Sequence, residues 1–301
     1  MIISKLNCSI GILIHNEAQN IGKLLDALLR QTLEKVAISE IIVISSASND
    51  GSDDIVEKHS LANKNVRLIR EAERKGKSAA INTFLKEAKE NIVLISSGDI
   101  IPEKDTIEKM IEPFTDNRIG MTGSHPIPVN KPDSFTGFWV NLQWNLHHRI
   151  ALQSPKLGEM VAFRKVLDRI PADSPVDEAS IEAIITKMGL QLKYIPEAVV
   201  YNKGPESIAE FIKQRRRIAA GHIWLKRQNS YLVSTNKPFL LLKALGSEIR
   251  QNPFRIHYIL FICLLEIWSR FLGWFDLIIL KRNPYKWEII DSTKKLAQED
   301  N

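Results

Sequence analysis

The first 115 residues alternate short apolar runs with segments of helical periodicity, and this alternation constrains the fold more than any other feature. The runs of strand length are CSIGILI, EIIVIS, NVRLIR and NIVLIS. The segments between and after them predict helices, namely NIGKLLDALLRQ, GSDDIVEKHSLA, KSAAINTFLKEAK and, directly after the fourth strand and its turn, EKDTIEKMIEPF. Strands and helices in this order form a mostly parallel sheet covered on both faces. We therefore expect an α/β fold with a Rossmann-like, mixed sheet.

The rest of the chain is less regular and ends in helices. RIGMTGS and EMVAFRK predict strands on either side of an aromatic-rich helix, FTGFWVNLQWNLHHRIAL. DEASIEAIITKMG predicts a helix that ends at Gly189, and QLKYIPEAVVYN predicts a strand. From about Pro205 onward the pattern is helical. We expect an α/β domain over residues 1–230 and a helical region over residues 231–301.

The charge and cysteine content of the sequence indicate which cellular compartment and which classes of partner to expect. The net charge is +6, and cations are dense in residues 213–227 and after residue 280. Such clusters suit phosphates. No helix-turn-helix, zinc-finger or RNA-binding signature accompanies them, so we expect no nucleic-acid partner. Cys8 and Cys263 make no disulfide framework, which favours a reducing compartment, and we expect the N-terminus to be a first strand rather than a signal peptide.

Polar segments follow each of the first four predicted strands. They are HNEAQN (15–20), SSASNDGSDD (45–54), ERKGKSAAIN (73–82) and SSGD (96–99). Each has a local explanation as a helix cap, a turn or surface charge. The carboxyl ends of neighbouring parallel strands meet at one sheet edge, however, and open α/β folds bind ligands there. Lysines beside the free N–H groups of a helix start suit a diphosphate, so these segments together favour a nucleotide site.

In their order along the chain, these segments resemble the inverting glycosyltransferases of family 2, which have the GT-A nucleotide-sugar fold. The likeness covers about residues 8–225, from ILIHNEAQNIGKLLDALLRQ through VLISSGDIIPEKDTIEKM and VDEASIEAIITKMG to PESIAEFIKQRRRI. It implies that a sugar moves from a UDP- or GDP-sugar to a hydroxyl or phosphate acceptor, in glycan or lipid-linked glycan synthesis. The partners would be a nucleotide-sugar donor and a glycan or lipid-phosphate acceptor.

The resemblance also implies roles for individual residues. Donor binding falls to Asn16, Glu17, Asp50, Lys77 and Asn82. Asp99 would hold Mg²⁺ or Mn²⁺, because a hard cation takes one or two carboxylates and completes its shell with phosphate oxygens and water. The matching segments further imply a base at Asp177 or Glu178 and a diphosphate or acceptor contact at Gln214 and Arg217.

The helical segments leave some of these roles open. Asp177 is the better chemical match to the family's base and Glu178 the better positional match, whereas both would also suit a helix cap. Gln214 and Arg217 are three apart and share a helix face, so Arg215 and Arg216 are expected to be solvated or to face lipid headgroups. His222 lies one turn beyond and is either structural or part of the site.

Several positions depart from the family pattern. Ser45 and Ser46 stand where the family has two aspartates, Ser97 replaces the first aspartate of the metal motif, and Ile218 replaces a tryptophan. The acidic pair at residues 177–178 has the reverse order. The serines at these positions are the best support for an alternative function, a non-catalytic nucleotide-sugar-binding scaffold with a degenerate metal site.

The stretch over residues 255–280 is the most apolar of the chain. It is long enough to span a bilayer, but Glu266, Arg270 and Asp276 interrupt it, and charges at the bilayer centre are costly. Glu266 and Arg270 can pair along one helix face. We expect a helix in the headgroup zone, and a peripheral or monotopic protein on the cytoplasmic side of the membrane; packing on the α/β domain of a cytoplasmic protein is the alternative.

Overall fold

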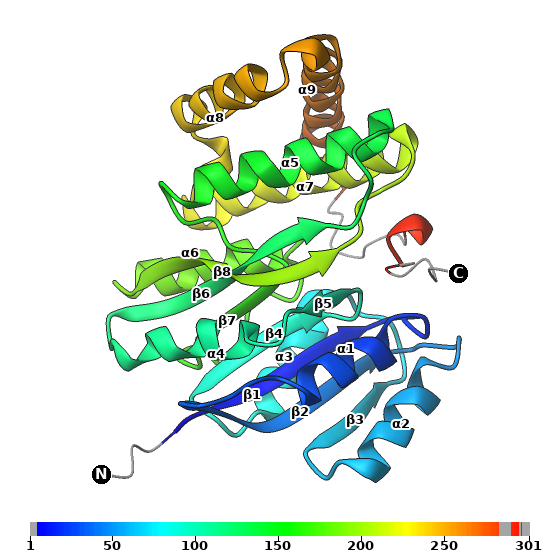
Figure 1. The fold of residues 1–301 in the computed structure, drawn as a ribbon, viewed down its shortest axis with the longest axis vertical. Helices are drawn as coiled ribbons and strands as arrows, with labels where there is room; N and C mark the ends of the chain where they lie inside the picture. The colour runs from blue at the N-terminus through cyan, green and yellow to red at the C-terminus, as the bar shows by residue number, and fades with distance from the viewer. Residues whose placement is uncertain (1–4, 283–289, 295, 297–301) are drawn as a thin grey trace.

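The computed structural model describes residues 5–282, 290–294 and 296 (Figure 1). Its centre is an eight-stranded sheet in the order β3-β2-β1-β4-β7-β6-β8-β5. The strands are β1 (Leu6–Ile14), β2 (Val36–Ser46), β3 (Val66–Glu71), β4 (Ile92–Ser97), β5 (Ile100–Pro102), β6 (Ile119–Pro128), β7 (Met160–Arg164) and β8 (Gln191–Asn202). The pairs β1–β2, β2–β3, β1–β4 and β6–β8 are parallel, and the other three are antiparallel. The expected mixed, mostly parallel sheet is confirmed.

Helices cover both faces of the sheet, as the alternating pattern predicts. Side chains along a strand point to opposite faces, so Ile10 and Ile12 of β1 enter one apolar cluster and Leu13 enters another. The first cluster is completed by α1 (Ile21–Leu29), α2 (Ser52–Ala62) and α4 (Thr106–Ile111). The second is completed by α3 (Lys77–Glu87) and α6 (Asp177–Lys187).

The chain after β4 differs from the expectation of a turn that leads directly into a helix. Gly98 and Asp99 connect β4 to the short strand β5, which pairs antiparallel with β8. The buried Ile100 anchors this strand in the first apolar cluster. α4 begins only at Thr106, and the 3-10 turn η1 (Glu112–Thr115) continues it.

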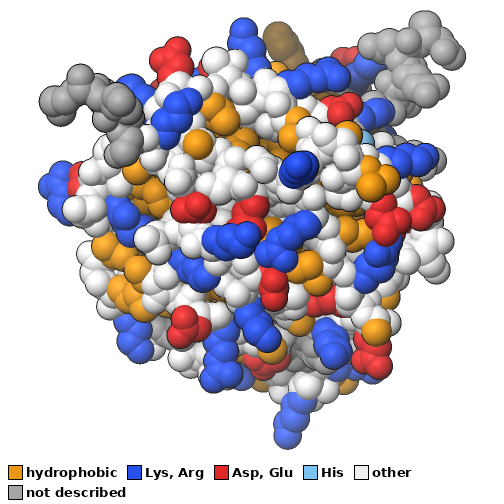
Figure 2. Space-filling view, turned by 90° about the horizontal axis from the view of Figure 1, so that it is seen from below, with side chains coloured by type: hydrophobic (Ala, Val, Ile, Leu, Met, Phe, Trp, Pro, Cys, Tyr) orange, Lys and Arg blue, Asp and Glu red, His pale blue; other side chains and the backbone are white. Residues whose placement is uncertain are grey.

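A layer of helices lies beyond one side of the sheet (Figure 1). α5 (Phe135–Ala151) and α7 (Ile208–Asn229) run side by side, and α8 (Pro238–Gln251) and α9 (Ile256–Ile278) pack on them. Of the helical region predicted over residues 231–301, residues 283–289, 295 and 297–301 lie outside the described part of the chain. The end of the molecule opposite this layer carries interspersed charges of both signs (Figure 2).

Two of the charged residues that interrupt the apolar helix α9, Glu266 and Asp276, form ion pairs with α7. Arg215 donates two hydrogen bonds to Glu266, at 2.7 and 2.8 Å, and Arg216 pairs with Asp276. The expectation of a solvated or lipid-facing side chain is therefore wrong for Arg215, whereas the Arg216 side chain is 40% exposed beside its carboxylate partner. Arg270 also binds Glu266, at 2.9 Å, which confirms the predicted pairing along α9.

Candidate active site

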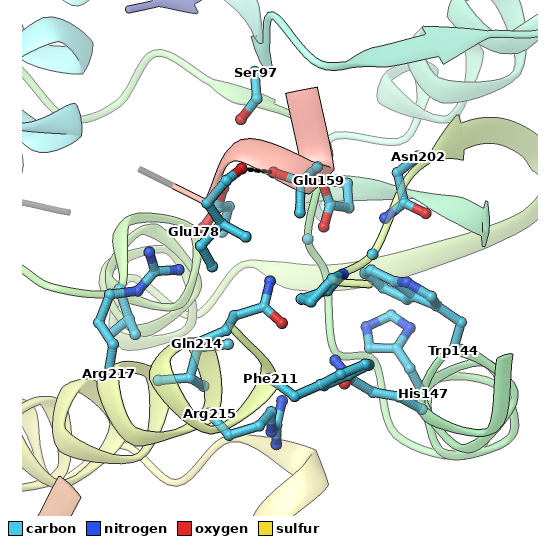
Figure 3. Close-up of a pocket in the computed structure, with 18 of the residues that line it drawn as sticks. Ser97, Trp144, His147, Glu159, Glu178, Asn202, Phe211, Gln214, Arg215 and Arg217 are labelled. Carbon is cyan, nitrogen blue, oxygen red and sulfur yellow. Dashed lines mark hydrogen bonds between the residues drawn. The ribbon is translucent and has the colours of Figure 1, made fainter. Parts of the chain in front are cut away.

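One cavity of about 760 Å³ connects the carboxyl ends of the central strands with the helical layer (Figure 3). Strand register aligns these ends, since Leu13 of β1 lies opposite Ser97 of β4 and Ile14 lies opposite Ser45 of β2. The N-termini of α3 and α6 and one side of α7 complete this part of the wall. The predicted meeting of polar segments at one sheet edge is therefore present in the fold. The volume of the cavity is within the range of small-molecule binding sites.

The turn after β1 lies directly beside the turn after β4. A Cβ placed on Gly98 would come within 2.7 Å of Ile14 Cγ2 and 2.8 Å of Glu17 Cγ, closer than real Cβ contacts. Glycine at residue 98 thus lets the Glu17 side chain lie over the β4 turn, next to Asp99. Burial, followed by the nearby charge of Asp99, raises the pKa of Glu17 to about 7.

An ion pair joins the starts of α3 and α6. Lys77 Nζ lies 2.6 Å from Glu178 Oε1, and both side chains line the cavity. Burial alone lowers the pKa of Lys77, but the carboxylates of Glu178 and Asp177 outweigh it and raise that pKa above its usual value. In turn, burial alone raises the pKa of Glu178, and the Lys77 charge and hydrogen bond bring it below its usual range.

The two candidate bases have different surroundings. Asp177 is fully buried, accepts a hydrogen bond from Ser78 Oγ and lies behind the cavity wall. Its Oδ2 has no hydrogen-bond partner among the described residues. Burial raises the pKa of Asp177 to about 6, with Lys77 opposing the shift. Glu178 is the member of the pair that faces the cavity.

Carboxyl groups gather around Asp99. Glu159, just before β7, lines the same wall, and its pKa is raised to about 7 by burial and then by the charge of Asp99. Burial also raises the pKa of Asp99. Asn202 opposes this rise in the pKa of Glu159, and its own buried Oδ1 has no hydrogen-bond partner among the described residues. Carboxylates and an amide oxygen held together against their own repulsion suit a hard divalent cation.

No group of three or more His, Cys, Asp or Glu side chains arranged to hold a metal is present in the described part of the chain. A cation at Asp99 and Glu159 would therefore need further oxygen ligands from a bound diphosphate or from water. With those additional ligands, Asp99 and Glu159 would suit Mg²⁺ or Mn²⁺.

Gln214 and Arg217, the two residues of α7 predicted to contact the diphosphate or the acceptor, both line the cavity. Figure 3 shows Gln214 and Arg217 projecting from α7 on the side that faces Glu178 and Glu159. Burial lowers the pKa of Arg217 to about 10, against the opposing charges of Asp177, Glu178 and Glu159. His222 also lines the cavity, and burial holds its pKa well below the usual value, which keeps it neutral.

Three residues predicted to bind the donor do not line the cavity. Asp50 accepts hydrogen bonds from the backbone N–H groups of Ala18 and Ser52, both at 3.0 Å. Asn82 makes a reciprocal pair of hydrogen bonds with the backbone of residue 170, at 2.8 and 3.0 Å. The Asn16 side chain accepts from Asn49 N at 2.9 Å. All three hold neighbouring loops in place, and their role in donor binding stays a prediction.

Other residues of the cavity were not singled out from the sequence. On the strand side they are Arg74, Lys156, Glu159 and Asn202, and near the C-terminus Lys294. On the helix side, Trp144, His147 and Phe211 line a second, more apolar part of the cavity (Figure 3). Phe211 stacks on Trp139 with ring centroids 4.0 Å apart. The aromatic-rich segment 135–152 was the available signal for this part.

Comparisons with known proteins agree with this geometry. The family model "Glycosyl transferase family 2" matches residues 9–171. The chain is 30% identical over 117 residues to "Glycosyltransferase AglE" of Haloferax volcanii, covering 39% of this chain and 38% of that protein. It is 26% identical over 220 residues to "Poly-beta-1,6-N-acetyl-D-glucosamine synthase" of Staphylococcus aureus, covering 69% and 52%. The matched region thus spans about half or less of these relatives.

Solved structures share the fold. A mannosyltransferase, PcManGT from Pyrobaculum calidifontis, in complex with GDP-Man and Mn²⁺, superposes with a TM-score of 0.62 at 21% identity, covering 94% of this chain and 88% of that one. Glucosyl-3-phosphoglycerate synthase from Mycobacterium tuberculosis, with Mn²⁺, UDP and glucosyl-3-phosphoglycerate, gives 0.50 at 16% identity, covering 74% and 80%. With its motifs, strand-end cavity and sheet in agreement, the chain belongs to glycosyl transferase family 2 and has the GT-A fold.

Proposed function

We propose that the protein is an inverting, metal-dependent glycosyltransferase that moves a sugar from a nucleotide-diphosphate sugar to a hydroxyl or phosphate acceptor. The observation that carries this proposal is the convergence of Asp99, Lys77 and Glu178 on one cavity from three different elements. Nucleotide complexes of the structural relatives support a UDP- or GDP-sugar as the donor class.

The acceptor proton goes to Glu178. Glu178 is ionised and faces the cavity, so it can take the proton from an acceptor oxygen that attacks the sugar carbon. A base on the side of the sugar opposite the leaving diphosphate gives inversion. Lys77 holds the Glu178 carboxylate in place and, with Arg217, brings positive charge to the diphosphate.

Asp99 and Glu159 would hold the divalent cation. Such a cation, when bound there, would supply Lewis-acid stabilisation for the diphosphate. Gly98 keeps Asp99 beside Glu17 at the end of β4, so the position of this carboxylate is fixed by the packing of two strand ends.

The acceptor enters from the helical layer. The cavity continues past Phe211 to Leu241 and Leu245 of α8 and to Ile262 and Ile267 of α9. The Ile267 side chain is 65% exposed, so the apolar part of the cavity reaches the outer surface of α9. An apolar passage of this kind suits an acceptor linked to a lipid.

The outer surface of α8 and α9 supports attachment to a membrane. α9 belongs to a stretch, Pro253–Ile278, that is long and apolar enough to cross a bilayer. Its two carboxylates, Glu266 and Asp276, pair with arginines of α7. Large apolar side chains on the outer surface are exposed, namely Phe239, Leu242, Phe254, Leu260, Phe261, Leu264, Ile267, Trp268, Phe271 and Trp274. We infer a protein that lies on the cytoplasmic side of the membrane, peripheral or monotopic.

Thermal unfolding with UDP or GDP, each with and without Mn²⁺, tests the donor and metal assignments. A ligand present at a hundredfold its Kd stabilises the fold by about 2.7 kcal/mol. We expect one nucleotide to stabilise the protein only with Mn²⁺, Asp99→Asn to lose that stabilisation, and the exposed-site control Asp133→Asn to keep it. Stabilisation by neither nucleotide would overturn the proposal.

The non-catalytic scaffold is the second candidate, because Ser45, Ser46 and Ser97 replace aspartates of the family pattern. A turnover assay distinguishes the transferase from the non-catalytic scaffold. Release of free nucleotide from a UDP- or GDP-sugar supports the transferase if Glu178→Gln abolishes it while nucleotide binding is kept. Tight nucleotide binding with no release from any donor supports the scaffold.

A further inference from the structure

A short segment from the far end of the chain lies across the edge of the cavity. We call residues 290–294 and 296 the C-terminal strap. Ile290, Thr293 and Lys294 line the cavity, and Ile290 and Leu296 are buried. No motif in the sequence marks this segment as part of the site.

The strap is hydrogen-bonded to two elements that contribute other residues to the cavity, the turn before α1 and the start of α7. On the strand wall, the Asn20 side chain donates to Lys294 O at 2.6 Å and accepts from Leu296 N at 3.3 Å. On the helix wall, Ser292 Oγ donates to Glu210 Oε2 of α7 at 2.7 Å. The strap therefore ties the turn before α1 to the start of α7, two elements that make different parts of the proposed active site.

Lys294 reaches from the strap into the turn after β1. Its ammonium donates to His15 O at 2.5 Å, to Asn16 O at 2.8 Å and to Glu17 Oε1 at 2.6 Å. An ammonium has three hydrogens, so these three acceptors use its full donor capacity. Lys294 therefore has no N–H group left to bind a donor directly, and can act on it only through its charge and through the turn that it holds.

That turn carries Glu17, one of the carboxyl groups that lie around Asp99. The Glu17 side chain lies over Gly98, beside Asp99, and is only 8% exposed. Without a nearby cation, two carboxylates at this end of the cavity would repel an anionic diphosphate. Lys294 supplies that cation and at the same time fixes the backbone of the turn, in which Asn16 adopts a left-handed conformation with φ of 59°.

We propose that Lys294 is a positioning residue of the donor site, and that docking of the C-terminal strap completes the site for a nucleoside diphosphate. The inference rests on the proposed function, because it assumes that the strand-end part of the cavity holds the donor. It adds a residue to the site and gives the end of the chain a role in nucleotide affinity.

Calorimetric titration of the full chain with UDP, GDP and Mn²⁺ tests the proposal. We expect Lys294→Met to weaken nucleoside diphosphate binding by tenfold or more and to leave the affinity for Mn²⁺ alone unchanged or higher, since a competing cation is removed. A general loss of structure would weaken both. Lys243→Met, which removes an exposed lysine of α8 that binds Gln153, is the control and should bind like the wild type.

A double-mutant cycle shows whether Lys294 acts through Glu17. In the Glu17→Gln background, Lys294→Met should have less than a third of its effect on nucleotide affinity. Lys294→Arg, which keeps the charge, should bind nucleotide more tightly than Lys294→Met. If the wild type binds nucleotide and Lys294→Met binds it equally well, this inference is wrong and the proposed function stands. If the wild type binds neither nucleotide, the proposed function itself fails.

Discussion

Lys77 Nζ and Glu178 Oε1 lie 2.6 Å apart although 101 residues separate them in the chain. The contact joins the first residue of α3 to the second residue of α6 across the cavity wall. It keeps Glu178 ionised and turned toward the cavity, whereas its neighbour Asp177 is buried against Ser78. The two acidic residues that the sequence leaves as alternatives thus have separate places in the structure.

Exchange of the two carboxylates for amides separates their roles. Glu178→Gln should lower kcat by about 10² to 10⁴, the usual contribution of a general base, with nucleotide affinity within a few-fold of the wild type. Asp177→Asn should lower kcat less, because that side chain lies behind the wall. Steady-state kinetics with a UDP- or GDP-sugar provide the measurement. A larger loss in Asp177→Asn than in Glu178→Gln would assign the base to Asp177.

The acidic limb of the pH profile should depend on Lys77. Its charge lowers the pKa of Glu178, so the wild type keeps an ionised base at low pH. Lys77→Met removes that charge, the pKa of Glu178 rises, and the fall in kcat on acidification begins at a higher pH. The profile of kcat against pH at saturating donor checks this, with the exposed Lys75→Met as the control. An unshifted limb would mean that Glu178 does not limit the rate on the acidic side.

Gly98→Ala should disturb both the fold and the donor site. The added Cβ would overlap Ile14 and Glu17, and overpacking of this kind costs about 1–3 kcal/mol. We expect a lower unfolding midpoint in denaturant together with weaker nucleotide binding. Gly246→Ala on α8 is the matched control, because its Cβ meets no atom within 4 Å and alanine favours a helix. It should be neutral or stabilising; equal effects of both substitutions would contradict the close approach of the two turns.

Binding to lipid vesicles should depend on the outer surface of α9. Trp268 and Trp274 are 52% and 41% exposed, and burial of a large apolar side chain contributes about 1.5–3 kcal/mol. Trp268→Ser with Trp274→Ser should therefore reduce co-sedimentation with anionic vesicles by at least tenfold. Leu61→Ser removes an 88% exposed apolar side chain from α2 and should change nothing. Equal vesicle binding by both variants would argue against this surface as the attachment site.

Local sequence patterns determined the fold class and the position of the site along the strands. Apolar runs of strand length and amphipathic helices depend on residues close together in the chain, and so does the placement of HNEAQN and SSGD at strand ends. The structure confirms the mixed sheet and brings Glu17, Lys77 and Asp99 to one edge of it. The roles of these residues in catalysis stay predictions.

Only the tertiary structure decided which hydrogen-bond and ion-pair partners the polar side chains have. Asp50 and Asn82 have the residue types of a donor site, yet their hydrogen bonds go to nearby backbone. Arg215 and Arg216 resemble surface cations until α9 brings Glu266 and Asp276 to them. Lys294 reaches Glu17 across 277 residues. Periodicity and turn chemistry act over a few residues, whereas the partner of a buried charge depends on which distant segment packs against it, and no local pattern in the sequence records that.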